Sequence, residues 1–283
     1  MPLDIVRRLL APILDPVATS SYPTEPPLLQ PATRGLPEMD PTLCADDGAC
    51  AVACPTGAIV VEAAGSEAAA GSIWSIDAGK CIFCNACVLA CPNDAIRMGS
   101  RVELAAADRS ALVERAGMPR TAPAEDRLRR RIAARSGRSL HVRHLDSGSC
   151  NGCDWEIAAL LNPYHDIQRL GIDFVASPRH ADLLLVTGVM TANLAEAVRR
   201  TYEAMPEPRL VVAVGACAIS GGLFADSPAC AGGISGALPV DVFVPGCPPR
   251  PEALLEGLLA AIEGHRAHSD GLRDRARPGS VGR

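Results

Sequence analysis

The chain has 283 residues, a formal net charge of −5 at pH 7 and a hydrophobic content of 48%, which suits two modest domains with ordinary cores. The acidic balance and an aromatic content of 3% argue against nucleic-acid binding through a basic, base-stacking surface. No window approaches the ~20 apolar residues of a membrane helix, so no direct membrane span is expected. The twelve cysteines are the most informative part of the composition.

Residues 1–40 are rich in proline, which predicts an extended N-terminal segment lying along another surface. Residues 5–17 could form a short amphipathic helix, which we expect to rest on a partner subunit or to fray rather than to anchor in a membrane. Pro12 and Asp15 interrupt the apolar stretch after Arg7 and Arg8, and no small-residue cleavage site follows. A twin-arginine export signal is therefore not expected.

Residues 41–100 contain an internal repeat of two cysteine loops, each followed by Cys-Pro and a short apolar strand. The second copy has the spacing C-x2-C-x2-C-x3-C-P of bacterial two-cluster ferredoxins, whose fourth cysteine serves the other cluster. The first copy is the same except that Asp47 stands where the second cysteine belongs. This pattern predicts one cluster on Cys44, Asp47, Cys50 and Cys91. It predicts a second, a [4Fe–4S] cluster, on Cys54, Cys81, Cys84 and Cys87.

Asp47 leaves the composition of the first cluster open. A carboxylate is a harder ligand than a thiolate, so the cluster is either [4Fe–4S] with Asp47 on one iron or [3Fe–4S] without that iron. Alternatively, Asp47 is a plain turn residue, and Asp46 or a solvent molecule takes its place. Disulfides are a poorer explanation of the cysteines, because tight spacing inside a Cys-Pro run favours metal.

Residues 101–138 are rich in Arg and Ala, which predicts a solvated linker, with a specific anionic contact site as the alternative. A charged helix could form at 124–135. From 139 to 264 apolar strands alternate with helices, which predicts βαβ units and a doubly wound parallel sheet. Strands are expected at 140–145, 173–176, 182–188, 210–215 and 240–246. Helices are expected at 153–161, at 194–205 and after Pro251, and the tail 265–283 is expected to be disordered.

Four more cysteines lie just past predicted strand ends, where open α/β sheets bind ligands: Cys150, Cys153, Cys217 and Cys247. Glycines that let backbone N–H groups approach inorganic sulfides flank them: Gly148, Gly152, Gly215 and Gly246. We expect a [4Fe–4S] cluster here. A zinc site is the alternative, although its usual signature is two cysteine or histidine pairs.

Two further residues of this domain have less specific signals. Glu156 lies one helical turn past Cys153 and could handle protons near the cluster; solvation on the helix surface is the alternative. Cys230 follows no strand, and as a lone cysteine it is expected to be a small buried hydrophobe.

The motifs resemble known subunits. Residues 18–97, with "CIFCNACVLACP", resemble the polyferredoxin-type subunit of formate hydrogenlyase and related membrane-bound hydrogenases. Residues 140–263, with "SGSCNGCDWE" and "VPGCPP", resemble the small subunit of these enzymes, which is homologous to the complex I subunit that carries the terminal cluster. The resemblance implies a fusion of a ferredoxin-like α+β domain with an α/β flavodoxin-like domain. Complex I has its first two cysteines adjacent, so the spacing of Cys150 and Cys153 is similar to the hydrogenase branch.

The resemblance implies an iron–sulfur electron-transfer subunit of a membrane-associated [NiFe] hydrogenase or formate hydrogenlyase-like complex, with no complete active site of its own. Its implied partners are a [NiFe]-bearing large subunit, which docks on the proximal cluster of the α/β domain, the membrane subunits, and an electron donor or acceptor protein. Its implied location is cytoplasmic, at the inner membrane. One alternative is a complex I-like quinone-reducing or ion-pumping module without nickel. Another is a non-enzymatic redox sensor, which should carry an effector module that the sequence does not show.

Overall fold

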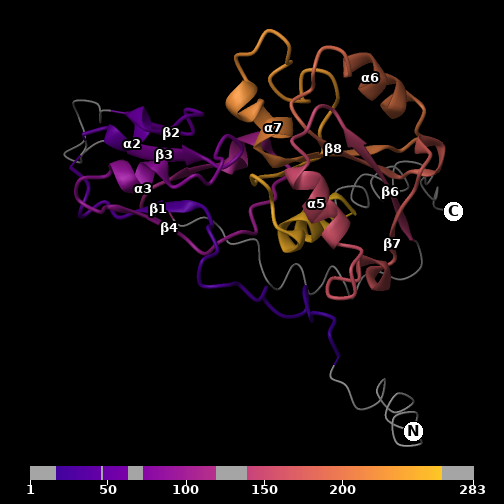
Figure 1. Cartoon of the computed structure of the whole chain (residues 1–283), viewed down its shortest axis with the longest axis horizontal. Coiled ribbons are helices and arrows are strands. Elements are labelled where there is room, and N and C mark those ends of the chain that lie inside the picture. Colours follow the sequence, from indigo (N-terminus) through magenta and orange to yellow (C-terminus); the bar gives the residue numbers. More distant parts are fainter. Residues whose placement is uncertain (1–16, 46, 63–72, 119–138, 263–283) are drawn as a thin grey trace, which may run out of the picture.

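The computed structural model describes residues 17–45, 47–62, 73–118 and 139–262. Within these residues a small cysteine-rich module lies beside a larger α/β module (Figure 1). The two helices expected at 5–17 and 124–135 lie outside the described residues, apart from Val17, and so does the tail 265–283. No helix among the described residues has both the length and the apolarity needed to cross a membrane.

The small module is built from the predicted repeat. Each cysteine loop leads into a short helix and then a strand, α2 (Ala49–Val52) with β2 (Ile59–Glu62) and α3 (Ala86–Ala90) with β4 (Ile96–Met98). The two strands belong to separate antiparallel sheets. The first pairs β4 with β1 (Pro37–Met39). The second has the order β2-β3-β5 and adds β3 (Ile73–Asp77) and β5 (Val113–Arg115).

The large module contains a parallel five-stranded sheet in the order β10-β9-β8-β6-β7. The sequence predicted its strands: β6 (Leu140–Asp146), β7 (Ile172–Phe174), β8 (Leu183–Thr187), β9 (Leu210–Val214) and β10 (Val242–Val244). Its helices are α5 (Gly152–Ala159), α6 (Ala195–Glu203), α7 (Gly215–Ser220) and a helix at 251–262. Short 3-10 turns complete it: η2 (Ile167–Leu170), η3 (Pro178–His180) and η4 (Gly222–Phe224).

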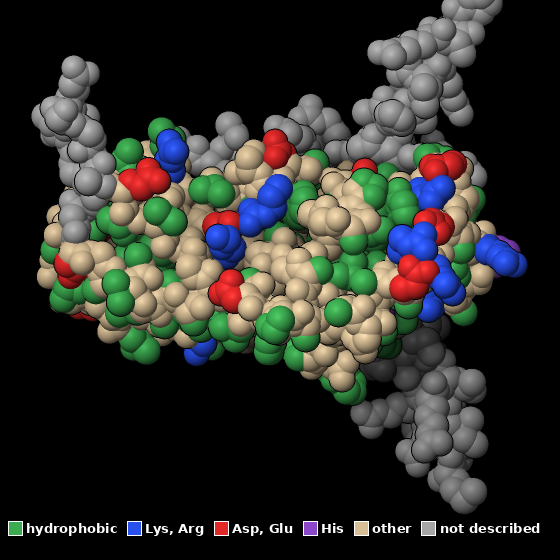
Figure 2. Space-filling view, turned by 90° about the horizontal axis from the view of Figure 1, so that it is seen from above, with side chains coloured by type: hydrophobic (Ala, Val, Ile, Leu, Met, Phe, Trp, Pro, Cys, Tyr) green, Lys and Arg blue, Asp and Glu red, His purple; other side chains and the backbone are tan. Residues whose placement is uncertain are grey.

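Every residue of β8 and β9 is buried, as expected for central parallel strands covered on both faces. Alternate side chains enter different cores. Leu183 and Leu185 pack with α5 and the helix at 251–262, whereas Leu184 and Val186 share a core with the cysteine-rich module. The outward side of α6 carries alternating Arg and Glu ion pairs, seen as mixed blue and red over this end of the molecule in Figure 2.

Residues 101–118, expected to belong to a linker, are part of the fold. They include the 3-10 turn η1 (Arg109–Leu112) and strand β5, and Ala106 forms an isolated β-bridge with Phe243 of β10. The apolar side chains of Leu104 and Leu112 are buried here. The Arg109 guanidinium donates to both carboxylate oxygens of Asp77, at 2.8 and 2.7 Å. The arginines that suggested a solvated segment therefore include one that ties it to β3.

The N-terminal segment lies on the chain's own α/β module. The Ser20 N–H donates to the Tyr164 carbonyl at 2.8 Å, and the Arg169 guanidinium donates to the Ser20 carbonyl at 2.7 Å. Tyr22 is buried, and its hydroxyl donates to Glu103 at 2.7 Å. Residues 17–36 thus form a strap along this module, with turns at 22–24 and 31–32, and residues 37–39 continue into β1.

Candidate metal centres

All twelve cysteines lie within the described residues, and none of them forms a disulfide. Eleven of them face three places, two inside the cysteine-rich module and one at the edge of the parallel sheet. Among the described residues, no three His, Cys, Asp or Glu side chains come close enough together to hold a single metal ion.

The first place is a small cavity in the cysteine-rich module. It is lined by the complete set predicted for the first cluster: Cys44, Asp47, Cys50 and Cys91. Apolar side chains of Val61 and Ile96 close it from the strands. Cys91 comes from the second loop of the repeat, so the chain crosses over as the cross-ligation rule requires.

The second place is a small cavity lined by the complete set predicted for the second cluster: Cys54, Cys81, Cys84 and Cys87. Here Cys54 crosses over from the first loop. Burial, above all, raises the pKa of the Cys81 thiol to about 12; the Phe83 N–H opposes this, and nearby thiols add to it. Burial and neighbouring thiols disfavour the thiolate form, so these cysteines would lose their protons readily only when they bind a cation. Iron would supply that positive charge.

The backbone around the two cavities repeats as closely as the sequence does. Gly48 and Asn85 hold equivalent positions before α2 and α3, and both have left-handed φ angles, 70° and 72°. The Ala58 N–H donates to Cys54 Sγ at 3.2 Å, and the Ala95 N–H donates to Cys91 Sγ at the same distance. Left-handed residues and N–H···S bonds are the backbone features that cradle iron–sulfur clusters, so the donor set and its surroundings fit that cofactor.

Asp47 departs from the repeat in a visible way. Its carboxylate accepts a hydrogen bond from the Ala49 N–H at 3.0 Å and is exposed, although the residue still lines the first cavity. The hydrogen bond is the one a turn residue would make. A carboxylate has further lone pairs, so its role as an iron ligand stays a prediction.

The third place lies at the carboxyl edge of the parallel sheet. Cys150 and Cys153 follow β6, Cys217 follows β9 and Cys247 follows β10. Burial, first of all, raises the pKa of Cys217 to about 11, and the thiols of Cys247 and Cys150 raise it further. The pKa of Cys153 is raised by the same causes, burial first and then its three cysteine neighbours and Asp154. The sheet therefore gathers four thiols that are far apart in the sequence.

Two of the predicted glycines are sterically required at this site. Gly215 has φ +83°, and a Cβ there would lie 2.8 Å from Cys153 Sγ. Gly246 has φ +155°, and a Cβ there would lie 2.3 Å from the Pro249 backbone. Gly148 also has positive φ and would meet Thr191, whereas a Cβ on Gly152 would make only ordinary contacts.

The second and third places are neighbours. Burial, first of all, and then the Cys150 thiol raise the pKa of Cys247, and the Cys84 thiol raises it further. Phe83 and the loop Pro245–Arg250 line one pocket between the modules. Phe83 has φ 56°, an unusual conformation for a bulky residue. Sequence reasoning did not find Phe83, because its signal is a backbone angle.

A partly buried polar network, also missed by sequence reasoning, supports the third place. His144 Nε2 lies 2.8 Å from Asp154 Oδ1, and the Thr187 hydroxyl donates to the same oxygen at 2.8 Å. The Ser149 hydroxyl donates to the other oxygen, Oδ2. Asp154 follows Cys153 directly, so this network holds the start of α5.

Glu156 and Cys230 are two further residues near the third site. Burial, first of all, raises the pKa of Glu156; Arg250 lowers it and Glu252 raises it. The carboxyl therefore lies on the side of α5 that faces the loop after Cys247, and its role in proton handling stays a prediction. Cys230 is half-buried in a β-bridge with Thr191, and its thiol adds to the raised pKa of Cys217.

Comparison with known proteins gives three family matches. Residues 150–261 match the family described as NADH ubiquinone oxidoreductase, 20 Kd subunit. Residues 74–97 and 36–59 each match a 4Fe-4S binding domain. The matched ranges contain the four cysteines of the third site and both cysteine loops in full.

Individual relatives each match less than half of the chain. A probable membrane-bound hydrogenase subunit of Pyrococcus furiosus is 52% identical over 140 residues, which are 48% of this chain and 84% of that protein. Formate hydrogenlyase subunit 7 of Escherichia coli is 46% identical over 125 residues, 44% of this chain and 49% of that protein. An NADH-quinone oxidoreductase subunit of Citrifermentans bemidjiense is 53% identical over 107 residues, 38% of this chain and 62% of that protein.

The chain thus spans about half the length of the formate hydrogenlyase subunit and under two thirds of the quinone oxidoreductase subunit. Among solved structures, a chain of the membrane-bound sulfane sulfur reductase, an archaeal respiratory membrane complex, is 36% identical. The match covers 46% of this chain and 73% of that one, with a TM-score of 0.40.

Proposed function

Because this chain belongs to the NADH ubiquinone oxidoreductase 20 Kd subunit family, we propose that its three cysteine sites form one path for electrons through a membrane-associated oxidoreductase complex. The two ferredoxin-type clusters occupy the two cavities of the small module, and a [4Fe–4S] cluster occupies the third site. The clusters supply the redox chemistry, and the chain positions, insulates and tunes them.

The observation that carries this proposal is the pocket shared by the second and third sites. Phe83, the neighbour of Cys84, lines it together with Cys247 of the third site. The first cavity adjoins the second through the crossed-over cysteines, Cys54 and Cys91. Electrons would therefore pass in the order first, second, third, or the reverse.

The strand order supports placing the third cluster in a flavodoxin-like domain. Numbered within the module, the order β7-β6-β8-β9-β10 is 2-1-3-4-5, which is the flavodoxin-like arrangement. Ligands in such sheets bind outside the carboxyl ends of the strands, where Cys150, Cys217 and Cys247 lie. The chain would then be a fusion of a ferredoxin-like subunit with a hydrogenase small subunit.

The surroundings of the third site support a protein partner there. Trp155 on α5 is 76% exposed, and Leu223 and Phe224 beside Cys217 are 58% and 54% exposed. Large apolar side chains that cluster on a surface usually mark an interface. We propose that a [NiFe]-bearing large subunit covers this surface, and that the chain reaches the membrane through partner subunits.

The test is metal analysis and turnover of the purified complex. Nickel together with H₂ activity is expected, and Cys153→Ser should abolish turnover while the ferredoxin-type clusters keep their EPR signals. Cys230→Ser is the matched control, because it removes a thiol that the path does not use. Wild-type turnover in the Cys153→Ser complex would contradict the proposed path.

A second function is worth testing because the 53% identity to a quinone oxidoreductase subunit is close to the 52% identity to the hydrogenase subunit. In that case the same electron path would end at a quinone and the complex would contain no nickel. The two-residue spacing of Cys150 and Cys153 supports the hydrogenase assignment instead. Quinone reduction by a nickel-free complex would establish the second function.

A further inference from the structure

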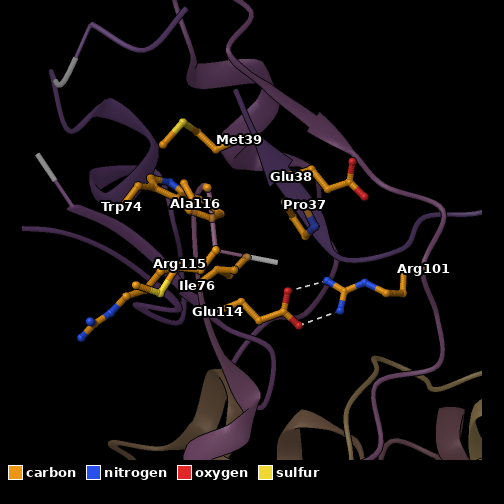
Figure 3. Close-up of a pocket in the computed structure, with 11 residues that line it drawn as sticks. Pro37, Glu38, Met39, Trp74, Ile76, Arg101, Glu114, Arg115 and Ala116 are labelled. Carbon is orange, nitrogen blue, oxygen red and sulfur yellow. Dashed lines mark hydrogen bonds and ion pairs between the residues drawn. The ribbon is translucent and has the colours of Figure 1, made fainter. Parts of the chain in front are cut away.

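Trp74 of β3 carries a buried polar atom that the fold leaves unsatisfied. The side chain is 4% exposed, and its indole Nε1 has no regular hydrogen-bond partner within the described part of the chain. Figure 3 shows the indole beside Met39 and Ala116, away from the ion pair between Arg101 and Glu114. A buried indole N–H usually finds an acceptor, so this one needs an explanation.

The position of Trp74 in the sheet places it against the first cavity. Trp74 is paired with Val61 of β2, and Val61 lines that cavity together with Cys50. Trp74 and Cys50 also belong to the same buried core. Both side chains are buried, Trp74 at 4% and Cys50 at 7% exposure, so the unsatisfied indole N–H and the Cys50 sulfur lie in one core beside the first cavity. A neutral thiol is only a weak acceptor, whereas a thiolate that ligates iron is a stronger one.

The repeat shows that this contact has no counterpart at the second cavity. Ile59 and Ile96 are equivalent because each lies five residues after its Cys-Pro cysteine, Cys54 or Cys91. The sheet pairings then make Pro37, opposite Met98, the equivalent of Trp74, opposite Val61. Pro37 lines the second cavity but has no side-chain donor.

We propose that the Trp74 indole N–H donates a hydrogen bond to the Cys50 sulfur when that sulfur ligates the first cluster, and so raises the reduction potential of this cluster alone. The proposal rests on the proposed function, since it needs a cluster in the first cavity. A donor to a ligating sulfur stabilises the reduced, more negative cluster more than the oxidised one. Trp74 would therefore separate the potentials of two clusters that otherwise share a repeated backbone.

The test is a potentiometric EPR titration of the complex carrying Trp74→Phe. The reduction potential of the first cluster should fall by about 59 mV, which corresponds to a tenfold change in its one-electron reduction equilibrium. The potentials of the second and third clusters should stay unchanged. Trp74→His, which keeps a ring N–H, should restore part of the shift. Tyr22→Phe is the matched control, because it also removes a buried side-chain donor, one that bonds Glu103 and no cysteine.

A second measurement leaves Trp74 intact. The chain has two tryptophans, so complexes of the wild type and of Trp74→Phe that are labelled with ¹⁵N-indole differ in the label at Trp74 only. Pulsed EPR should then detect a ¹⁵N coupling in the signal of the first cluster in the wild type that is absent from Trp74→Phe. An unshifted potential in Trp74→Phe, or no ¹⁵N coupling, would overturn the role of Trp74. A first cavity without any cluster in the wild-type complex would instead overturn the proposed function.

Discussion

Replacing Gly215 with alanine should damage the third site selectively. The residue has φ +83°, a conformation in which a side chain costs ~1–2 kcal/mol. The new Cβ would lie 2.8 Å from Cys153 Sγ, so the ligand itself must move or the backbone must shift. Together these effects should destabilise the fold by about 2 kcal/mol and lower the occupancy of the third cluster.

The assay combines thermal unfolding with EPR spin quantitation of the reduced complex. Gly215→Ala should lower the unfolding temperature and reduce the signal of the third cluster, while the two ferredoxin-type clusters keep theirs. Gly236→Ala is the matched control, because a Cβ there meets nothing within 4 Å. A Gly215→Ala complex with a full third-cluster signal at its wild-type potential would refute the argument that this glycine makes room for Cys153.

Three further outcomes are expected. Asp47→Ala should change the EPR signal of the first cluster if Asp47 ligates iron, and Asp47→Cys should give a stable [4Fe–4S] cluster. An unchanged [4Fe–4S] signal in Asp47→Ala would show that Asp47 makes only its turn hydrogen bond. Burial, opposed by Asp154, lowers the pKa of His144, so its stabilising effect is complete above its unfolded pKa of about 6.5 and is lost as the pH falls through the folded value. Melting temperatures from pH 5 to 7.5 should therefore fall less steeply at the acid end for His144→Gln, and parallel curves would exclude this. Arg109→Met should break the ion pair with Asp77, lower the melting temperature and increase proteolysis within 101–118. If the variant melted and resisted proteolysis like the wild type, this segment would be held by its apolar contacts alone.

Sequence patterns predicted the parts of the fold that depend on local periodicity and spacing. The five apolar stretches became the strands of the parallel sheet, because central strands such as β8 are apolar at every position but the last. Each cysteine loop has the ferredoxin spacing, and the rule that its fourth cysteine serves the other cluster assigned the ligands to the two sets that line the two cavities. The internal repeat of residues 41–100 was therefore the main basis for assigning these ligands.

Contacts between distant segments could not be predicted in the same way. Residues 101–118 look solvated because their arginines are conspicuous, yet Leu104 and Leu112 are buried and Arg109 reaches Asp77. Tyr22 of the N-terminal strap gave no periodic signal, although its side chain is buried and bonds Glu103. In each case the contact joins residues that are far apart in the sequence, so no local spacing or periodicity predicts it.

The shared core explains how one chain keeps the second and third sites together. Leu184 and Val186 of the parallel sheet belong to the same buried core as Trp74 and Ile76 of the small module. Gly79, two residues before Cys81, packs so closely on α7 that a Cβ would lie 2.8 Å from the Ile219 side chain. Cys217 lies on the same short helix, so both modules are packed together next to their ligands. Because close-packed cores resist small displacements, the distance from Cys84 to Cys247 is set by folding rather than by docking of separate subunits.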